Sequence, residues 1–295
     1  MHRESWGPGS RQAASSRVRS SSRRRSSPRT RRRPAGRKAR GRNVSRLIDS
    51  ISGWAIWLSM LRPVQFIDAL RRLRVDPEDS QQGVRLFYAA GGNDDARALA
   101  LMKASPEGQR ILDAREPLVF GAEDRAHLRA MRPGSLGHAL AVFYDEEDIS
   151  WEGLTGATEG LMPEPRDAEH GFFRDRSRAV HDVLHVLTGY GRDYLGEAVL
   201  HGFTYAQYGN HAYGFLGALT CLGLCFVGRR DAPGLFIDAC RRGHRADSLL
   251  AVDWAAALDE PVEELRARFQ IGPPPAYVPL DSSLLAAKNG LASTH

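Results

Sequence analysis

The 295-residue chain has only three cysteines, and this number excludes two kinds of cysteine-based site. Cys221, Cys225 and Cys240 are too few for a disulfide framework and for a four-cysteine zinc site. Cys221 and Cys225 share a helix face within an apolar stretch. We therefore expect reduced thiols in the core of a protein from a reducing compartment.

Long hydrophobic runs are also missing. No stretch reaches the about 18 unbroken apolar residues of a membrane-spanning helix, and no apolar segment near the start indicates a secretory signal. The nearest candidate is residues 212–227, AYGFLGALTCLGLCFV, which is short and rich in glycine. We expect a buried core helix there. The alternatives are a helix that lines a pocket for a long apolar ligand and a helix that lies against a membrane.

Acidic residues are nearly absent from the first 45 residues. This segment holds 14 Arg, one Lys and a single acid, Glu4, so its formal charge is +14. Because the whole chain carries +6, the remainder carries −8. With few large apolar residues, 1–45 is predicted to be a disordered, solvated Arg/Ser-rich tail. The alternatives are a segment that contacts nucleic acid or anionic lipid, an organelle transit peptide, and upstream sequence translated from a wrong start.

Alternating β-branched runs with two-residue turns are absent from the rest of the chain. Helical periodicity recurs instead, and Ser105 before Pro106 is a typical helix start. We predict an all-α fold, with a multi-helix single domain over 46–280 and a loosely held end over 281–295. Residues 246–258 are among the predicted helices.

The stretch RAVHDVLHVLTGYGRDYLGE, residues 178–197, places two histidines, an aspartate and a glutamate in largely apolar surroundings. On a helix, His181 and His185 lie one turn and about 40° apart, so their imidazoles point to one place. Asp182 lies about 60° from His185, at the edge of the same face. It is a third metal ligand, a residue that orients a histidine, or a base.

Glu197 lies near the start of the next helix and faces back across the intervening turn. Its carboxylate closes a site that one helix cannot close alone. Burying these groups is costly without a cation, so the pattern favours a divalent metal. The alternative is a solvated ion-pair network in which Asp182 and Glu197 pair with Arg176, Arg178 or Arg192.

The stretch HDVLHVLTGYGRDYLGE resembles the signature of the coenzyme Q (ubiquinone) biosynthesis protein 4 family, HDxxH followed by a Glu twelve positions after the second His. The signature maps onto His181, Asp182, His185 and Glu197. The segments RSRAVHD, SLGHALAVFY, QYGNHAYGFLGAL and LLAVDWAAALDEPVEELRARFQI resemble other parts of the same family. The resemblance covers roughly residues 50–280.

The resemblance implies that His181, Asp182, His185 and Glu197 bind a divalent metal, usually zinc. It implies a metal-dependent decarboxylase, in which the C1 carboxylate of a polyprenylated 4-hydroxybenzoate-type precursor is replaced by a hydroxyl. His181 and Asp182 are then the candidate catalytic residues. Zinc does no redox chemistry, so oxygen must react with the ring itself or the metal must be redox-active.

The implied partners are the polyprenylated quinone precursor, other ubiquinone biosynthesis enzymes and a membrane surface, with a homodimer left open. We expect no nucleic acid beyond nonspecific contacts of the tail. In a bacterium the chain is expected in the cytoplasm or at the inner membrane. In a eukaryote it is expected at the matrix side of the mitochondrial inner membrane.

Other functions stay open beside the enzyme. One is a non-catalytic scaffold that binds prenyl lipid and organises the pathway enzymes. Another is a metal hydrolase of the HD type, which needs a further upstream ligand that the sequence does not offer. Arg176 and Arg178 are candidates for attracting the substrate carboxylate. His201 and His211 lie outside the motif, and we interpret them as surface or metal-orienting residues.

Overall fold

The computed structural model describes residues 54–75, 80–118, 122–146 and 161–280. These described residues are helical and contain no strand, only an isolated bridge between Ser135 and Pro261. The all-α prediction is therefore confirmed. The tails predicted at 1–45 and 281–295 lie outside the described residues.

A short helix over residues 54–60 comes first. The named helices that follow are α2 (Pro63–Val75), α3 (Ser80–Ala89), α4 (Ala96–Lys103), α5 (Pro106–Ala114), α6 (Ala122–Ala130), α7 (Leu136–Glu146), α9 (Ala168–Thr188), α10 (Tyr194–Tyr208), α11 (His211–Leu224), a 3₁₀ turn η1 (Cys225–Val227), α12 (Ala232–Arg245) and α13 (Val262–Arg268).

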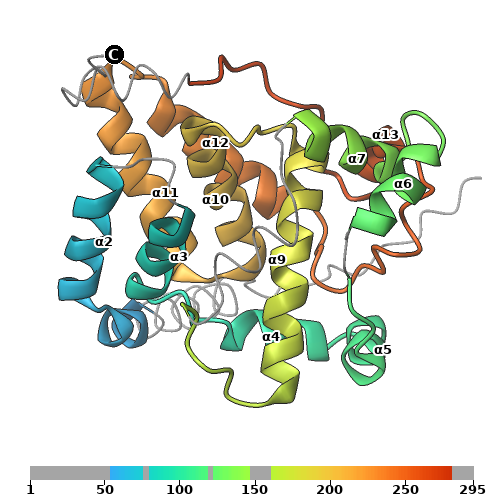
Figure 1. The fold of residues 1–295 in the computed structure, drawn as a ribbon, viewed down its shortest axis with the longest axis horizontal. Helices are drawn as coiled ribbons and strands as arrows, with labels where there is room; N and C mark the ends of the chain where they lie inside the picture. The colour runs from blue at the N-terminus through green and yellow to red at the C-terminus, as the bar shows by residue number, and fades with distance from the viewer. Residues whose placement is uncertain (1–53, 76–79, 119–121, 147–160, 281–295) are drawn as a thin grey trace, which may run out of the picture. The chain divides into compact units, whose positions relative to one another are not determined.

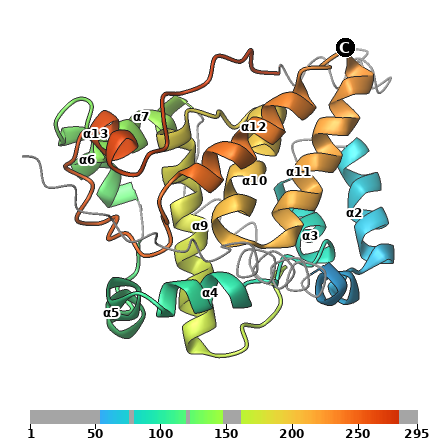
Figure 2. The same cartoon turned by 180° about the vertical axis from the view of Figure 1, so that it is seen from behind.

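The long helix α9 runs between two groups of helices (Figure 1). On one side α7 and α13 pack against it, and on the other α10 packs against it and against α11 and α12. Helices α2 and α3 pack together on the outer side of α11, as the view from behind also shows (Figure 2). The main core lies along α9 and α10, where Val183, Leu187, Leu200 and Phe203 are fully buried.

Local sequence signals set the two ends of α9. The side chain of Asp167 accepts a hydrogen bond from the His170 N–H, which satisfies one free donor of the first turn. At the other end, Gly189 adopts a left-handed conformation with φ of 76° and its N–H donates to the His185 carbonyl. Glycine adopts this conformation at little cost, so the helix ends where the sequence predicts.

The helix predicted over 246–258 is wrong, because this segment forms successive turns. Its backbone is held by side chains from neighbouring helices: the Leu249 N–H donates to Gln207, and the Val252 carbonyl accepts from Arg176. Leu249 and Trp254 are both fully buried. The apolar composition therefore reflects burial on more than one side and not the single apolar face of a helix.

The apolar stretch at 212–227 forms α11 and η1, and its glycines allow close helix packing. A Cβ added at Gly217 would lie 2.6 Å from the Ala198 carbonyl oxygen on α10 and 2.6 Å from the Phe236 ring on α12. The prediction of a buried core helix is confirmed for this face. Leu219 and Leu222 on the same helix are exposed. The described residues contain no helix long and apolar enough to cross a bilayer.

Candidate metal centre

Three of the four predicted ligands converge. The Nε2 atoms of His181 and His185 lie 3.1 Å apart, and each lies 3.3 Å from an oxygen of Glu197. The His185 side chain is fully buried, whereas those of His181 and Glu197 are 25% and 31% exposed. Among the described residues these three form the group of ligating side chains that could hold a metal ion. His185 thus anchors the group in the core, while His181 and Glu197 are accessible to solvent.

The orientation of His185 is fixed from behind. Its Nδ1 lies 2.9 Å from the Tyr190 carbonyl oxygen, and its ring stacks on Phe143 at a centroid distance of 5.3 Å. A carbonyl oxygen can only accept, so Nδ1 must carry a hydrogen, and Nε2 is the ring nitrogen that faces Glu197 and His181. Metal-binding histidines are commonly held this way.

The turn after α9 is held by two arginines. Arg266 donates to the Val186 and Leu187 carbonyl oxygens at 2.8 and 2.9 Å. Arg242 donates to the Thr188 carbonyl at 3.2 Å, and its guanidinium lies over the Tyr190 ring. Cations at a helix C-terminus satisfy carbonyls that lack intrahelical partners. They thereby hold the turn that carries the Tyr190 carbonyl.

The start of α10 sets the position of Glu197. Asp193 accepts from the Leu195 and Gly196 N–H groups, and the Tyr277 hydroxyl donates to it at 2.8 Å. A Cβ added at Gly196 would lie 2.2 Å from the Gly191 carbonyl oxygen, so only glycine lets the chain approach this closely. Glu197 then lies one turn into the helix and faces the two histidines.

His181, His185 and Glu197 shift one another's protonation equilibria. Burial alone would raise the pKa of the Glu197 carboxyl, but the imidazoles facing it hold that pKa well below its ordinary value. Burial would lower the pKa of His181, yet the Glu197 carboxylate raises it. Two imidazoles and a carboxylate this close together are stabilised by a cation among them, either a proton on an imidazole or a metal ion.

Asp182 does not join this group of ligating atoms. It is buried, and its Oδ2 accepts a hydrogen bond of 3.0 Å from the Tyr144 hydroxyl on α7. Burial and the adjacent Asp182 carboxylate raise the pKa of Tyr144, which therefore stays protonated and donates. The structure thus provides a partner for Asp182 that orients it beside the histidines, and its ligand role stays a prediction.

The family model for the coenzyme Q (ubiquinone) biosynthesis protein Coq4 matches residues 74–275, which include His181, His185 and Glu197. The chain belongs to the Coq4 family.

Curated relatives agree with this assignment. The mitochondrial ubiquinone biosynthesis protein COQ4 homologue of Mus musculus is 31% identical over 60% of this chain and 65% of its own length. The corresponding protein of Phaeosphaeria nodorum is 30% identical over 59% of this chain and 58% of its own length. The chain therefore spans less than two thirds of the length of these Coq4 proteins.

A solved structure shows the same fold. It comes from Nostoc punctiforme PCC 73102 and is provisionally described as a ubiquinone biosynthesis protein. It aligns with a TM-score of 0.53 over 72% of this chain and 100% of its own, at 18% identity. This likeness supports the all-α Coq4 architecture of the described residues.

The arginines predicted near the Coq4 site differ in their roles. Arg176 is buried and donates to the Val252 carbonyl at 2.5 Å, so it holds the 246–258 segment. Arg178 donates to the Met162 sulfur at 3.7 Å. Arg192 approaches the centre, with its Nε 3.9 Å from Glu197. Of the predicted ion pairs, the one between Arg192 and Glu197 is therefore present.

The two histidines outside the motif are partly exposed. His211 pairs with Asp94 at 2.5 Å and packs edge-on against Trp54, at the start of α11. His201 is partly buried with its ring against Tyr213, and burial lowers its pKa to about 4. His201 is consequently a neutral imidazole near the Coq4 centre.

Several residues that shape the centre were missed at the sequence level. Asp193 could have been found, because an aspartate just before an apolar helical run is a typical N-cap. Tyr190 contributes a backbone carbonyl, which no side-chain pattern indicates. Arg266 and Tyr277 come from segments about 70 or more residues away in the chain. Only the fold brings them to the site.

Proposed function

We propose that this Coq4 family member acts in ubiquinone biosynthesis as a metal-dependent enzyme. The reaction replaces the C1 carboxylate of a polyprenylated 4-hydroxybenzoate-type precursor by a hydroxyl. The observation that carries the proposal is the convergence of two imidazole nitrogens and a carboxylate, rooted in the core and partly open to solvent. Catalytic metal sites keep three protein ligands and an open position in this way.

His181, His185 and Glu197 fit a divalent cation. Two observations support the fit: the Tyr190 carbonyl engages Nδ1 of His185 and leaves Nε2 facing the group, and the Nε2 atoms of the two histidines lie 3.1 Å apart. A bound divalent cation supplies a Lewis acid that stabilises negative charge developing as carbon dioxide leaves. Buried His185 and the Tyr190 carbonyl keep the donor geometry constant through the reaction.

Asp182 has the role of base or orienting group in this proposal. Its Oδ2 is held by Tyr144, and it lies next to His181 in the chain. A positioned carboxylate can take the proton of the ring hydroxyl or fix the adjacent imidazole. Arg192 is partly exposed, and its Nε lies 3.9 Å from Glu197. In this proposal its guanidinium attracts the anionic substrate to the solvent-exposed side of the three ligands.

The two histidines and the carboxylate suit zinc, and they equally suit iron(II) in its place. Two histidines and one carboxylate bind catalytic zinc, and the same set binds iron(II) in non-haem oxygenases. The proposed reaction is an oxidation. Dioxygen is the oxidant in both forms: with zinc it would react with the electron-rich ring directly and be reduced to hydrogen peroxide, whereas with iron(II) the metal could take part in its reduction. The identity of the bound metal therefore decides whether the metal takes part in the oxidation.

The proposed partners are the polyprenylated precursor, other enzymes of the pathway and a membrane surface, with a homodimer left open. The curated relatives are named as mitochondrial proteins. We propose that a eukaryotic chain lies at the matrix side of the mitochondrial inner membrane, and the names of these relatives support the organelle alone. A bacterial chain belongs in the cytoplasm or at the inner membrane.

Carbon dioxide release from a prenylated 4-hydroxybenzoate labelled in its carboxyl carbon tests the enzyme directly. The full chain is loaded separately with zinc and with iron(II) under air, beside His185→Ala and a matched control, His244→Ala, at an exposed histidine on α12. We expect release by the wild type and by His244→Ala only. Metal-loaded protein that releases no label but still binds the substrate would instead support the scaffold function.

A further inference from the structure

The outward face of α2 is apolar where a surface helix is normally polar. Val64 is 82% exposed and Ile67 is 48% exposed, and Val75 is exposed as well. On a helix these three positions and Arg71 fall within roughly 80° of arc. The opposite side of α2, with buried Ala69, packs towards α3.

Exposed apolar side chains are concentrated in this part of the molecule. Of the 14 exposed large hydrophobic residues among the described residues, seven lie between 54 and 75. Trp54, Ile56 and Leu58 belong to the helical segment before α2. Such clustering marks an interaction surface, since scattered exposed apolar residues are ordinary but a contiguous set is not.

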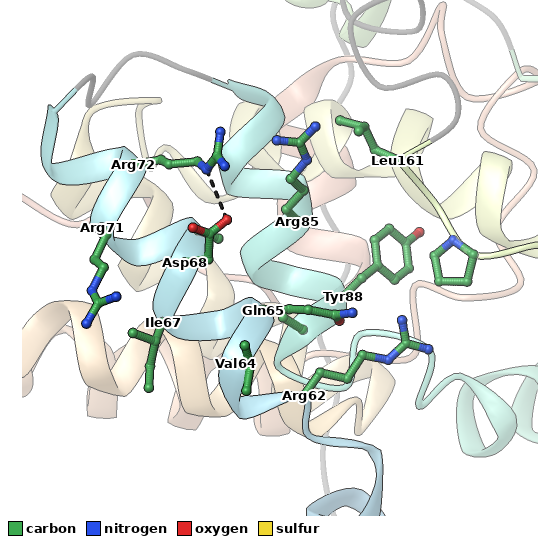
Figure 3. Close-up of a pocket in the computed structure, with 13 residues that line it drawn as sticks. Arg62, Val64, Gln65, Ile67, Asp68, Arg71, Arg72, Arg85, Tyr88 and Leu161 are labelled. Atoms are coloured by element: carbon green, nitrogen blue, oxygen red, sulfur yellow. Dashed lines mark hydrogen bonds and ion pairs between the residues drawn. The ribbon is translucent and has the colours of Figure 1, made fainter.

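Arginines border the same face. A cavity of about 940 Å³ opens beside α2 and α3, and its lining includes Val64, Ile67 and four arginines: Arg62, Arg71, Arg72 and Arg85. Figure 3 shows Arg72 and Arg85 reaching from α2 and α3 toward one end of the cavity, with Arg62 at the other end. Asp68, which pairs with Arg72 at 3.0 Å, is the one acidic residue of the lining.

We infer that this face, the α2 surface formed by Val64, Ile67, Arg71, Arg72 and Arg85, docks onto an anionic lipid bilayer, with the arginines along the cavity contacting lipid headgroup phosphates. Apolar side chains that alternate with arginines are typical of helices in the plane of a membrane. The long arginine stems allow the charge to reach phosphate while the apolar side chains enter the acyl boundary.

Charge favours a bilayer over an acidic protein. The chain beyond residue 45 carries −8, yet this face is basic, and the +14 segment 1–45 precedes it directly in the sequence. Clusters of basic residues beside an amphipathic helix are typical of binding to anionic lipids. The arginines are also spread along the cavity and do not converge on one point, which suits several headgroups better than one small anion (Figure 3).

The inference gives a surface to the membrane contact proposed above, and it is tested apart from the metal chemistry. The full chain is floated with vesicles of phosphatidylglycerol or of phosphatidylcholine. At ~0.5 M salt the Debye length is only roughly 4 Å, so the contribution of the basic tail is largely screened and apolar insertion remains. We expect Val64→Asp/Ile67→Asp to reduce binding about tenfold or more under these conditions. Val278→Asp, at an equally exposed valine, should bind like the wild type.

The arginines are tested at lower salt with variants of equal charge. Arg72→Glu/Arg85→Glu should lose most of the preference for phosphatidylglycerol, whereas Arg230→Glu/Arg241→Glu should keep it. Arg241 is exposed and paired with Asp238, as Arg72 is with Asp68, so the two changes are closely matched. Inorganic phosphate added at constant ionic strength should not displace the protein.

Three results would overturn the inference. The first is equal flotation of Val64→Asp/Ile67→Asp and the wild type, because binding would then come from the tail alone. The second is a wild type that ignores vesicles but binds an acidic protein through these arginines. The third is displacement by inorganic phosphate, which would assign the cavity to a free anion. Circular dichroism and metal content of each variant show whether its fold and metal centre are intact.

Discussion

The hydroxyl of Tyr144 decides how Asp182 is held. It donates to a buried carboxylate and is itself buried. We expect Tyr144→Phe to lower the free energy of unfolding by about 1–3 kcal/mol, because a buried acceptor loses its partner. Urea denaturation measures the change. Tyr205→Phe, at a half-buried tyrosine, is the control and should cost less.

Asp182→Asn separates the two roles open to this residue. The amide oxygen can still accept from Tyr144, but the side chain no longer carries charge. Because Asp182 lies outside the converging group, we expect the variant to bind metal with unchanged stoichiometry and to lose turnover. Loss of the metal in a folded Asp182→Asn protein would instead make Asp182 a ligand, as the motif alone suggests.

Helical spacing was sufficient to predict that His181 and His185 share one target, because residues four apart lie on the same face. The separate position of Asp182 was not accessible from spacing. Its side chain turns to Tyr144, a residue 38 positions earlier on α7. Contacts of this kind depend on which helices become neighbours, and periodicity carries no such information.

At the scale of helices, Arg266 links α13 to the end of α9. It is nearly buried and donates to two carbonyls there, besides pairing with Glu263. Charge-assisted bonds to unsatisfied carbonyls are strong, so Arg266→Ala should cost about 1.5–3 kcal/mol. Arg268→Ala on the same helix breaks an exposed pair with Glu260 and should cost about 1 kcal/mol at most. Equal losses in chemical denaturation would contradict the capping role.

Close approach of Gly196 to Gly191 lets α10 start where it presents Glu197. Gly196→Ala should lower the free energy of unfolding by about 1–3 kcal/mol through overpacking, and should weaken metal binding. The control is Gly223→Ala on α11, where an added Cβ meets nothing within 4 Å. That change should stabilise the helix by about 0.5–1 kcal/mol and leave metal binding unchanged, as calorimetry with the metal would show.

The sequence predicted those helices whose ends carry strong local signals. Asp167 and Gly189 fix α9, and Ser105 caps α5 by accepting from the Gly108 N–H, as expected. The failure at 246–258 has a physical cause. Trp254 and Leu249 are buried among other helices while Gln207 and Arg176 satisfy the backbone, so tertiary contacts replace the helical hydrogen bonds.

At the scale of the whole molecule, a metal ion held by His181, His185 and Glu197 would join α9 to α10 and should stabilise the fold. A ligand that binds only the folded state at a concentration 100 times its dissociation constant adds about 2.7 kcal/mol. For a domain of this size we expect the melting temperature to rise by about 5–10 °C, given roughly 2–4 °C per kcal/mol. A chelator should reverse the rise, and His185→Ala should show neither effect.

The most direct test of the account is the metal content of the full chain. Elemental analysis is made on the wild type, His185→Ala, Glu197→Gln and the control His244→Ala, each with its circular dichroism spectrum. We predict one divalent metal ion per chain in the wild type and the control, and none in the other two, with helix content unchanged. A well-folded wild type that holds no metal after incubation with zinc or iron(II) would contradict the account, because a proton shared by His181 and Glu197 would then explain the whole cluster.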